Sequence, residues 1–108
     1  MAEFEVVYYR RESGESPFQG WFDSLDNVAA GKMYSALLRM EAGNFSDSRR
    51  LQGGISERRV HSGPGYRIYY AIFRQRYVVL LGGGTKRTQV DDIRRARQAW
   101  HDFKKRAD

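Results

Sequence analysis

The sequence predicts a single α+β domain: a small, mostly antiparallel sheet with helices packed on one face, in the order β-α-α-β-β-β-α. Three observations predict this class. The 108 residues match the usual size of one domain and contain no repeat, linker or low-complexity tract. Apolar residues follow strand-like and helical patterns in turn along the chain. Hydrophobic residues make up 41% and aromatic residues 14%, enough for a real core. We therefore expect one domain over residues 1–108.

The first half of the chain predicts one strand and two helices. Residues 4–9, FEVVYY, are aromatic and β-branched, as in a strand. Ser16 followed by Pro17 is typical of a helix start, and Asp26 can cap a second helix that ends at Gly43-Asn44. Apolar residues recur at helical spacing after both caps, so we expect an antiparallel helix pair with one apolar face.

The second half predicts a loop over residues 45–54 and strands over 55–61, 65–74 and 77–82. Ser62-Gly63-Pro64-Gly65 is a clear turn, whereas Arg74-Gln75-Arg76 must turn without glycine. The glycines at 82–84 should let the chain leave the sheet in an unusual backbone geometry. Thr88 with Asp91 resembles a capping box for a last helix. Ile93, Ala96, Trp100 and Phe103 share one face of that helix.

The net positive charge comes from one central segment. Residues 48–90 contain nine arginines and lysines but a single acid, Glu57, whereas the whole chain carries only +6. Fifteen of the 19 basic residues are arginine, whose planar guanidinium group can donate two hydrogen bonds to one phosphate. A solvated surface would explain such charges, but their concentration favours a polyanionic partner.

Several classes of function are unsupported by the sequence. The chain has no cysteine, which excludes disulfides, thiol catalysis and thiolate metal sites. No His, Asp and Glu spacing suggests a metal site, and Gly82–Lys86 lacks the spacing of a phosphate-binding loop. We expect neither a metal nor a small-molecule cofactor. The start MAEFEVVYYRR fits neither a signal peptide nor a membrane span, so we expect a cytoplasmic protein without a membrane partner.

Four segments together resemble the phage-derived addiction-module killer proteins of the RelE/HigB/ParE toxin superfamily. They are residues 22–25, RMEAGNFSDSRRL at 39–51, GISERRVHSGPGYRIYY at 54–70 and LLGGGTKRTQVDDIRRARQAW at 80–100. The resemblance covers nearly the whole chain, and the family has the order of elements predicted above. The chain departs from the family pattern at Thr85, where an acidic or polar residue is usual, and at Arg58, where an apolar residue is frequent.

The resemblance implies a RelE-like toxin of a type II toxin–antitoxin module. Its partner would be a cognate antitoxin of the helix-turn-helix type, and its activity would be ribosome-dependent cleavage of mRNA, which inhibits translation. Two alternatives remain open. One is inhibition of DNA gyrase in the ParE manner, and the other is a non-toxic nucleic-acid-binding phage remnant. The basic segment favours the first and the last of these three readings.

The candidate catalytic residues are four side chains that the predicted sheet would bring together. Arg59 and His61 alternate along one strand and so share a face. Arg67 follows on the next strand, and Lys86 comes after the last one. RNA carries its own nucleophile, the 2′-hydroxyl, so fixed cations and one proton-transfer group, for which His61 is the nearest candidate, suffice for cleavage.

Further residues are candidates for binding the RNA: Arg49, Arg50, Arg58, Tyr66 and Arg87. Each has a structural alternative. Strand arginines are often simply solvated, and Arg67 could pair with Glu57 or lie on an aromatic face. Tyrosines at 66, 69 and 70 could stack on bases but are more often part of strand packing.

Overall fold

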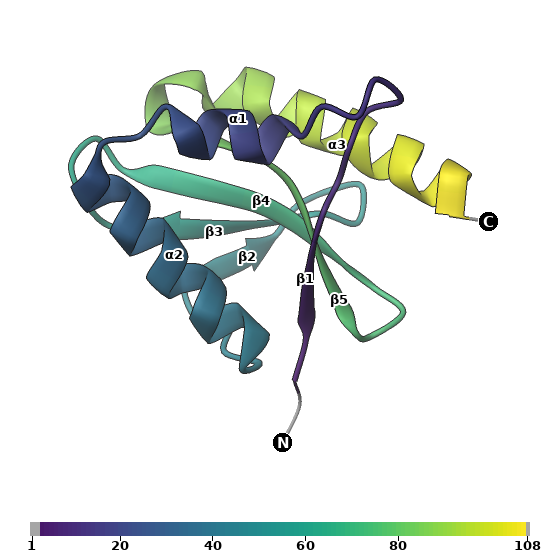
Figure 1. Ribbon diagram of the computed structural model, residues 1–108, viewed down its shortest axis with the longest axis horizontal. Coiled ribbons are helices and arrows are strands. Elements are labelled where there is room, and N and C mark those ends of the chain that lie inside the picture. The colour runs from purple at the N-terminus through teal and green to yellow at the C-terminus, as the bar shows by residue number, and fades with distance from the viewer. Residues whose placement is uncertain (1–2, 108) are drawn as a thin grey trace.

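The computed structural model describes residues 3–107 and confirms the α+β class (Figure 1). The chain forms β1 (Glu5–Tyr8), α1 (Pro17–Asp23), α2 (Asn27–Glu41), β2 (Ser48–Arg50) and β3 (Ser56–Val60). It continues through β4 (Tyr66–Phe73), β5 (Tyr77–Thr85), a 3-10 turn η1 (Lys86–Thr88) and α3 (Gln89–Ala107). No helix within these residues is both long and apolar enough to cross a membrane.

The sheet has five strands in the order β1-β5-β4-β3-β2. Only the pairing of β1 with β5 is parallel, and the other three pairings are antiparallel, as predicted. The predicted loop over residues 45–54 contains the short strand β2, which was missed. Its sequence, Ser-Arg-Arg, has no apolar alternation, because β2 lies at the edge of the sheet and both arginines are exposed.

The helices cover both faces of the sheet, so the prediction that they pack on one face is wrong. Ile68 and Tyr70 of β4 share a core with α1 and α2, around Phe18 and Met33. Their neighbours Tyr69 and Ala71 belong to a second core, with Ala96, Ala99 and Trp100 of α3. Adjacent strand residues point to opposite faces, so the continuous apolar runs in β4 and β5 serve two cores.

The predicted caps of the first two helices are confirmed. The side chain of Ser16 accepts a hydrogen bond from the backbone N–H of Gln19, and that of Asp26 accepts one from Ala29. The start of α3 differs in detail from the predicted capping box. The Thr88 hydroxyl donates to Oδ2 of Asp92 at 2.5 Å rather than pairing with Asp91.

The three glycines at 82–84 lie within β5 and do not release the chain from the sheet. A Cβ built on Gly83 would come within 2.2 Å of the Trp21 ring of α1, and one on Gly84 within 1.9 Å of the Asp92 carboxylate of α3. A Cβ on Gly82 would meet nothing within 4 Å. Close approach of the two helices, rather than backbone geometry, therefore requires glycine at 83 and 84.

The hairpin between β4 and β5 turns at Arg74 and Gln75, both with positive φ, at 52° and 57°. The backbone N–H of Arg76 donates to the carbonyl of Phe73 and closes this turn. A turn with two consecutive left-handed residues favours Asn-Gly, because left-handed backbone is unfavourable for other residues.

We expect Gln75→Gly to stabilise the protein by about 1 kcal/mol, because glycine relieves the left-handed strain at this position. For a domain of this size, that gain raises Tm by roughly 4–8 °C. The neighbouring Arg76→Gly is the control. Arg76 is not among the positive-φ residues, so this change should lower Tm. Thermal unfolding followed by circular dichroism measures both, and a lower Tm for Gln75→Gly would contradict the strain argument.

We expect Gly83→Ala to destabilise the fold by about 1–3 kcal/mol, the usual effect of overpacking, because Trp21 must move. Gly82→Ala adds the same methyl group one residue earlier, where space is open, and should change stability far less. Urea unfolding of the two variants measures this difference. Equal losses of unfolding free energy would exclude a specific role for Trp21.

Candidate nucleic-acid interface

A fully buried carboxylate lies at the centre of the basic segment. Glu57 is on β3, with Arg49 and Tyr69 as its cross-strand neighbours on β2 and β4. Nε of Arg49 donates to Oε1 of Glu57 at 3.1 Å, and Nε2 of Gln89 donates to Oε2 at 2.8 Å. Nε of Arg67 lies 3.4 Å from Oε2. The single acid of the basic segment thus joins three strands to the first residue of α3.

Arg67 is held by this carboxylate, so the structural alternative for it is confirmed. Its side chain is only 11% exposed, and it faces Glu57 across the sheet. One of its guanidinium nitrogens, Nη1, donates to the carbonyl of Gly65 at 3.5 Å. Glu57 balances the charge of Arg67, and a buried guanidinium needs such a partner of opposite charge.

The hydroxyl of Tyr69 is buried beside this pair and has no hydrogen-bond partner among the described residues. Burial, followed by the negative charges of Glu57 and Asp92, raises the pKa of Tyr69 above its ordinary value. The phenol therefore stays protonated at neutral pH.

The predicted cations at 59, 86 and 87 are exposed, and the backbone at Arg59 and at Lys86 is linked to Arg67. Arg59 is the direct cross-strand neighbour of Arg67. Lys86 follows β5, and its backbone N–H donates to the same Gly65 carbonyl that accepts from Arg67. Arg87 comes next, in η1. We call the surface formed by Arg49, Arg59, Arg67, Lys86 and Arg87 the basic face.

The predicted proton-transfer group, His61, lies just beyond the end of β3 and is exposed. It also lines a cleft between β3 and α2, together with Arg59. Both residues therefore lie where the end of β3 meets the neighbouring helix.

Three of the predicted RNA-binding residues are not on the basic face. Arg58 is the cross-strand neighbour of Ile68 and belongs to the face covered by α1 and α2. Tyr66 is half-buried on that same face, with its ring centroid 6.3 Å from that of Trp21. Arg50 is exposed on the edge strand β2, one residue out of phase with Arg49.

Three polar residues near the predicted sites were missed by sequence reasoning: Lys32 and Arg39 of α2 and Gln89 of α3. Lys32 and Arg39 are seven residues apart, two helical turns, and this spacing alone places them on one side of the helix. Gln89 carried no signal, because its contact with Glu57 joins segments far apart in the sequence.

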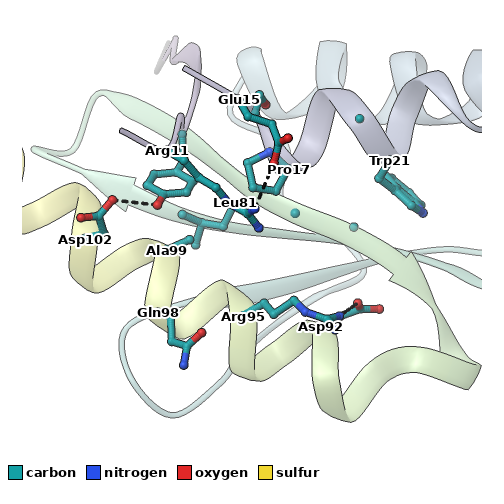
Figure 2. A pocket seen from close by; sticks show the side chains of 15 residues that line it. Arg11, Glu15, Pro17, Trp21, Leu81, Asp92, Arg95, Gln98, Ala99 and Asp102 are labelled. Carbon is teal, nitrogen blue, oxygen red and sulfur yellow. Dashed lines mark hydrogen bonds and ion pairs between the residues drawn. The ribbon is translucent and has the colours of Figure 1, made fainter. Parts of the chain in front are cut away.

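A larger cleft than the one between β3 and α2, about 720 Å³, lies elsewhere, between α1, α3 and β5 (Figure 2). Its charged side chains already have partners: Arg11 with Glu15 at 3.0 Å, and Arg95 with Asp92 at 3.5 Å. Acids outnumber bases in its lining, since Asp102 is also present. The cleft is therefore poorly suited to a polyanion.

One hydrogen bond in this cleft joins the two ends of the chain. The Tyr9 hydroxyl donates to Oδ2 of Asp102 at 2.7 Å, and Arg106 pairs with the same oxygen at 2.6 Å (Figure 2 shows Asp102). Burial, followed by the bond to Asp102, raises the pKa of Tyr9. The bond from Tyr9, followed by that from Arg106, lowers the pKa of Asp102. We interpret this cluster as structural.

No group of three or more His, Asp and Glu side chains within residues 3–107 is arranged to hold a metal ion. The basic face consists of guanidinium and ammonium groups, and two of its arginines contact one buried carboxylate. Such groups bind phosphate and stabilise negative charge that grows on it.

Comparison with known proteins identifies the family of this chain. An uncharacterised protein of Haemophilus influenzae is 38% identical over 81 residues, which cover 74% of this chain and 82% of that protein. A sequence profile of the phage-derived Gp49-like proteins (DUF891) matches residues 20–101, which contain α1 in part, α2, the four strands β2–β5 and most of α3. The chain belongs to the Gp49-like family of phage-derived proteins.

Proposed function

We propose that this protein is the toxin of a type II toxin–antitoxin module and cleaves mRNA on the ribosome without a metal ion. The observation that carries this proposal is the basic face, on which Arg59, Lys86 and Arg87 are exposed beside a buried Arg67–Glu57 pair. Membership of the Gp49-like family, which is toxin-like and of the RelE/HigB type, supports the same function.

The chemistry fits these side chains. In RNA cleavage the 2′-oxygen forms a bond to phosphorus, the bond from phosphorus to the 5′-oxygen breaks, and the 2′-hydroxyl proton passes to a base. Negative charge grows on the phosphoryl oxygens and on the leaving oxygen, which takes up a proton. Cations fixed before the reaction stabilise this charge most effectively.

Each residue then has a distinct part. Arg59 and Lys86 would contact the reacting phosphate, Arg87 and Arg49 would bind neighbouring phosphates, and His61 would transfer a proton. Arg67 would add positive potential from beneath, and Glu57 would position it. The ribosome would supply the mRNA in an extended conformation.

The partner in this proposal is a cognate antitoxin of the helix-turn-helix type. It would act by covering the basic face or by displacing α3. Displacement would break the hydrogen bond from Gln89 to Glu57, one of the contacts that hold α3 on the sheet. Either route would prevent the preorganised cations from contacting the substrate phosphate.

We expect Arg59→Ala and Lys86→Ala each to lower the rate of mRNA cleavage by about 10²–10³, the usual cost of losing one preorganised charge donor. His61→Ala should have as large an effect only if the imidazole transfers the proton. Lys105→Ala removes an exposed cation of α3 outside the basic face and is the control. The assay is mapping of mRNA 5′ ends in a purified translation system, with circular dichroism confirming that each variant folds.

Three outcomes would contradict this proposal. Full cleavage by both cation variants would exclude the proposed site. Intact mRNA with the unmodified protein, together with blocked gyrase supercoiling, would establish the ParE-like alternative. Normal growth of cells that express the folded protein without an antitoxin would support a non-toxic phage remnant.

We expect Glu57→Gln to destabilise the protein by about 3–5 kcal/mol, because it leaves the buried guanidinium of Arg67 without a counter-charge. Adding Arg67→Met removes that charge and should restore most of the lost stability, so the two changes are strongly non-additive. Chemical unfolding of the two single variants and the double variant measures this coupling. Additive losses would show that the pair does not act as a unit.

A further inference from the structure

A basic cleft, of about 590 Å³, lies between α2 and the end of β3. Four cations line it: Lys32 and Arg39 from α2, and Arg58 and Arg59 from β3. Asp47 is the only acid in its lining, and none of the four cations forms an ion pair with another residue within 3–107. We call it the α2 cleft.

Arg58 is the unusual member of this group, because only 3% of its surface is exposed. Within the described chain its side chain forms one hydrogen bond, from Nη1 to the backbone carbonyl of Asn44 at 2.9 Å. Burial lowers the pKa of Arg58, and the nearby charge of Arg39 acts in the same direction. The guanidinium nevertheless stays charged at neutral pH.

Burying this cation costs free energy, because its desolvation is only partly offset by the nearby charge of Asp47, with which Arg58 forms no ion pair. Arg67, the other buried arginine, has Glu57 as its partner, whereas Arg58 has only a carbonyl oxygen. An arginine that weakens the fold and lines a cation-rich cleft is the arrangement expected of an anion-binding residue.

The rest of the lining indicates which anion fits. Lys32, Ser35 and Arg39 follow one another at helical spacing on the cleft side of α2, and His61 lies opposite on the strand side. Of the exposed apolar residues of α2, Val28 lines the cleft, whereas Tyr34 and Leu38 do not. An acidic amphipathic peptide would need apolar contacts as well as charges to bind here. A phosphodiester group needs chiefly guanidinium, ammonium and hydroxyl groups.

We infer that the α2 cleft binds a phosphodiester group of a single-stranded RNA, at a site separate from the reacting phosphate. This inference rests on the proposed function, in which RNA is the substrate. Arg59 and His61 belong to the cleft and also to the proposed catalytic set. An RNA strand can therefore continue from the basic face, around the end of β3, into the cleft.

The test measures binding of a fluorescein-labelled 12-nucleotide RNA in which every 2′-hydroxyl is methylated, so that the nucleophile is blocked. Fluorescence anisotropy is recorded over a range of salt concentrations. We expect the double change Lys32→Ala/Arg39→Ala to weaken binding about tenfold or more. The log–log salt slope should fall in magnitude by about 0.7 for each phosphate group that the variant no longer binds. The matched control is Arg94→Ala/Lys105→Ala, which removes two exposed cations of α3 and should leave the slope nearly unchanged.

The Arg58→Met variant shows whether Arg58 serves RNA binding or the stability of the fold. If Arg58 serves the ligand, the Met variant keeps or raises Tm while RNA binding weakens about tenfold or more. A Tm lowered by several degrees with unchanged affinity of the folded protein would overturn the inference, because Arg58 would then be structural. The α2 double variant decides the matter even if Arg58→Met does not fold, since neither Lys32 nor Arg39 is buried.

The remaining outcomes distinguish this inference from the proposed function. If the protein cleaves mRNA but the cleft variants bind RNA as tightly as the unmodified protein does, the inference alone is overturned. Loss of RNA binding in the cleft variants of a protein that does not cleave mRNA overturns the proposed function alone. Displacement of the RNA by a poly-glutamate peptide at much lower concentration than by unlabelled RNA would assign the cleft to an acidic protein segment and overturn the inference.

Discussion

The arrangement of the basic face depends on one carboxylate. Glu57 is the single acid among the basic residues of the central segment, and it is fully buried where β2, β3, β4 and the start of α3 meet. Its two oxygens contact side chains from three different elements. Without this carboxylate, the positive charges of Arg67 and its neighbour Arg59 would lie on one face of the sheet without a counter-charge. The start of α3 would also lose the hydrogen bond from Gln89 to β3.

Local patterns in the sequence predicted most of the elements. Ser16 and Asp26 are caps whose hydrogen bonds lie within three residues, and the strand and helix periods of β4, β5 and α3 are equally local. The errors concern relations between distant segments. The continuous apolar runs of β4 and β5 do not say which helix covers which face, so the position of α3 opposite α1 and α2 was not predicted. The role of Gly83 depends on Trp21, far away in the chain.

The candidate site was predictable to a similar extent. The spacing of Arg59 and Arg67 about the turn at residues 62–65 predicted that the two lie together, and they are direct neighbours across β3 and β4. The strand period also implies that Arg58 points away from Arg59, although both were expected to contact the same RNA. The two cations of α2 were missed because exposed lysine and arginine on a helix are ordinary surface residues until a cleft is seen beside them.

The parallel pairing of β1 with β5 has a consequence for the synthesis of this chain. Glu5 is paired with Tyr77, so the first strand has no partner until β5 has been made. The valine and tyrosine side chains of residues 5–9 stay unpaired while α1, α2 and the strands β2–β4, which precede β5 in the chain, are synthesised. Contacts between distant segments slow folding. The same topology means that a chain truncated before β5 lacks a strand that contributes to both cores, and also lacks α3, so that one face of β4 has no helix to cover it.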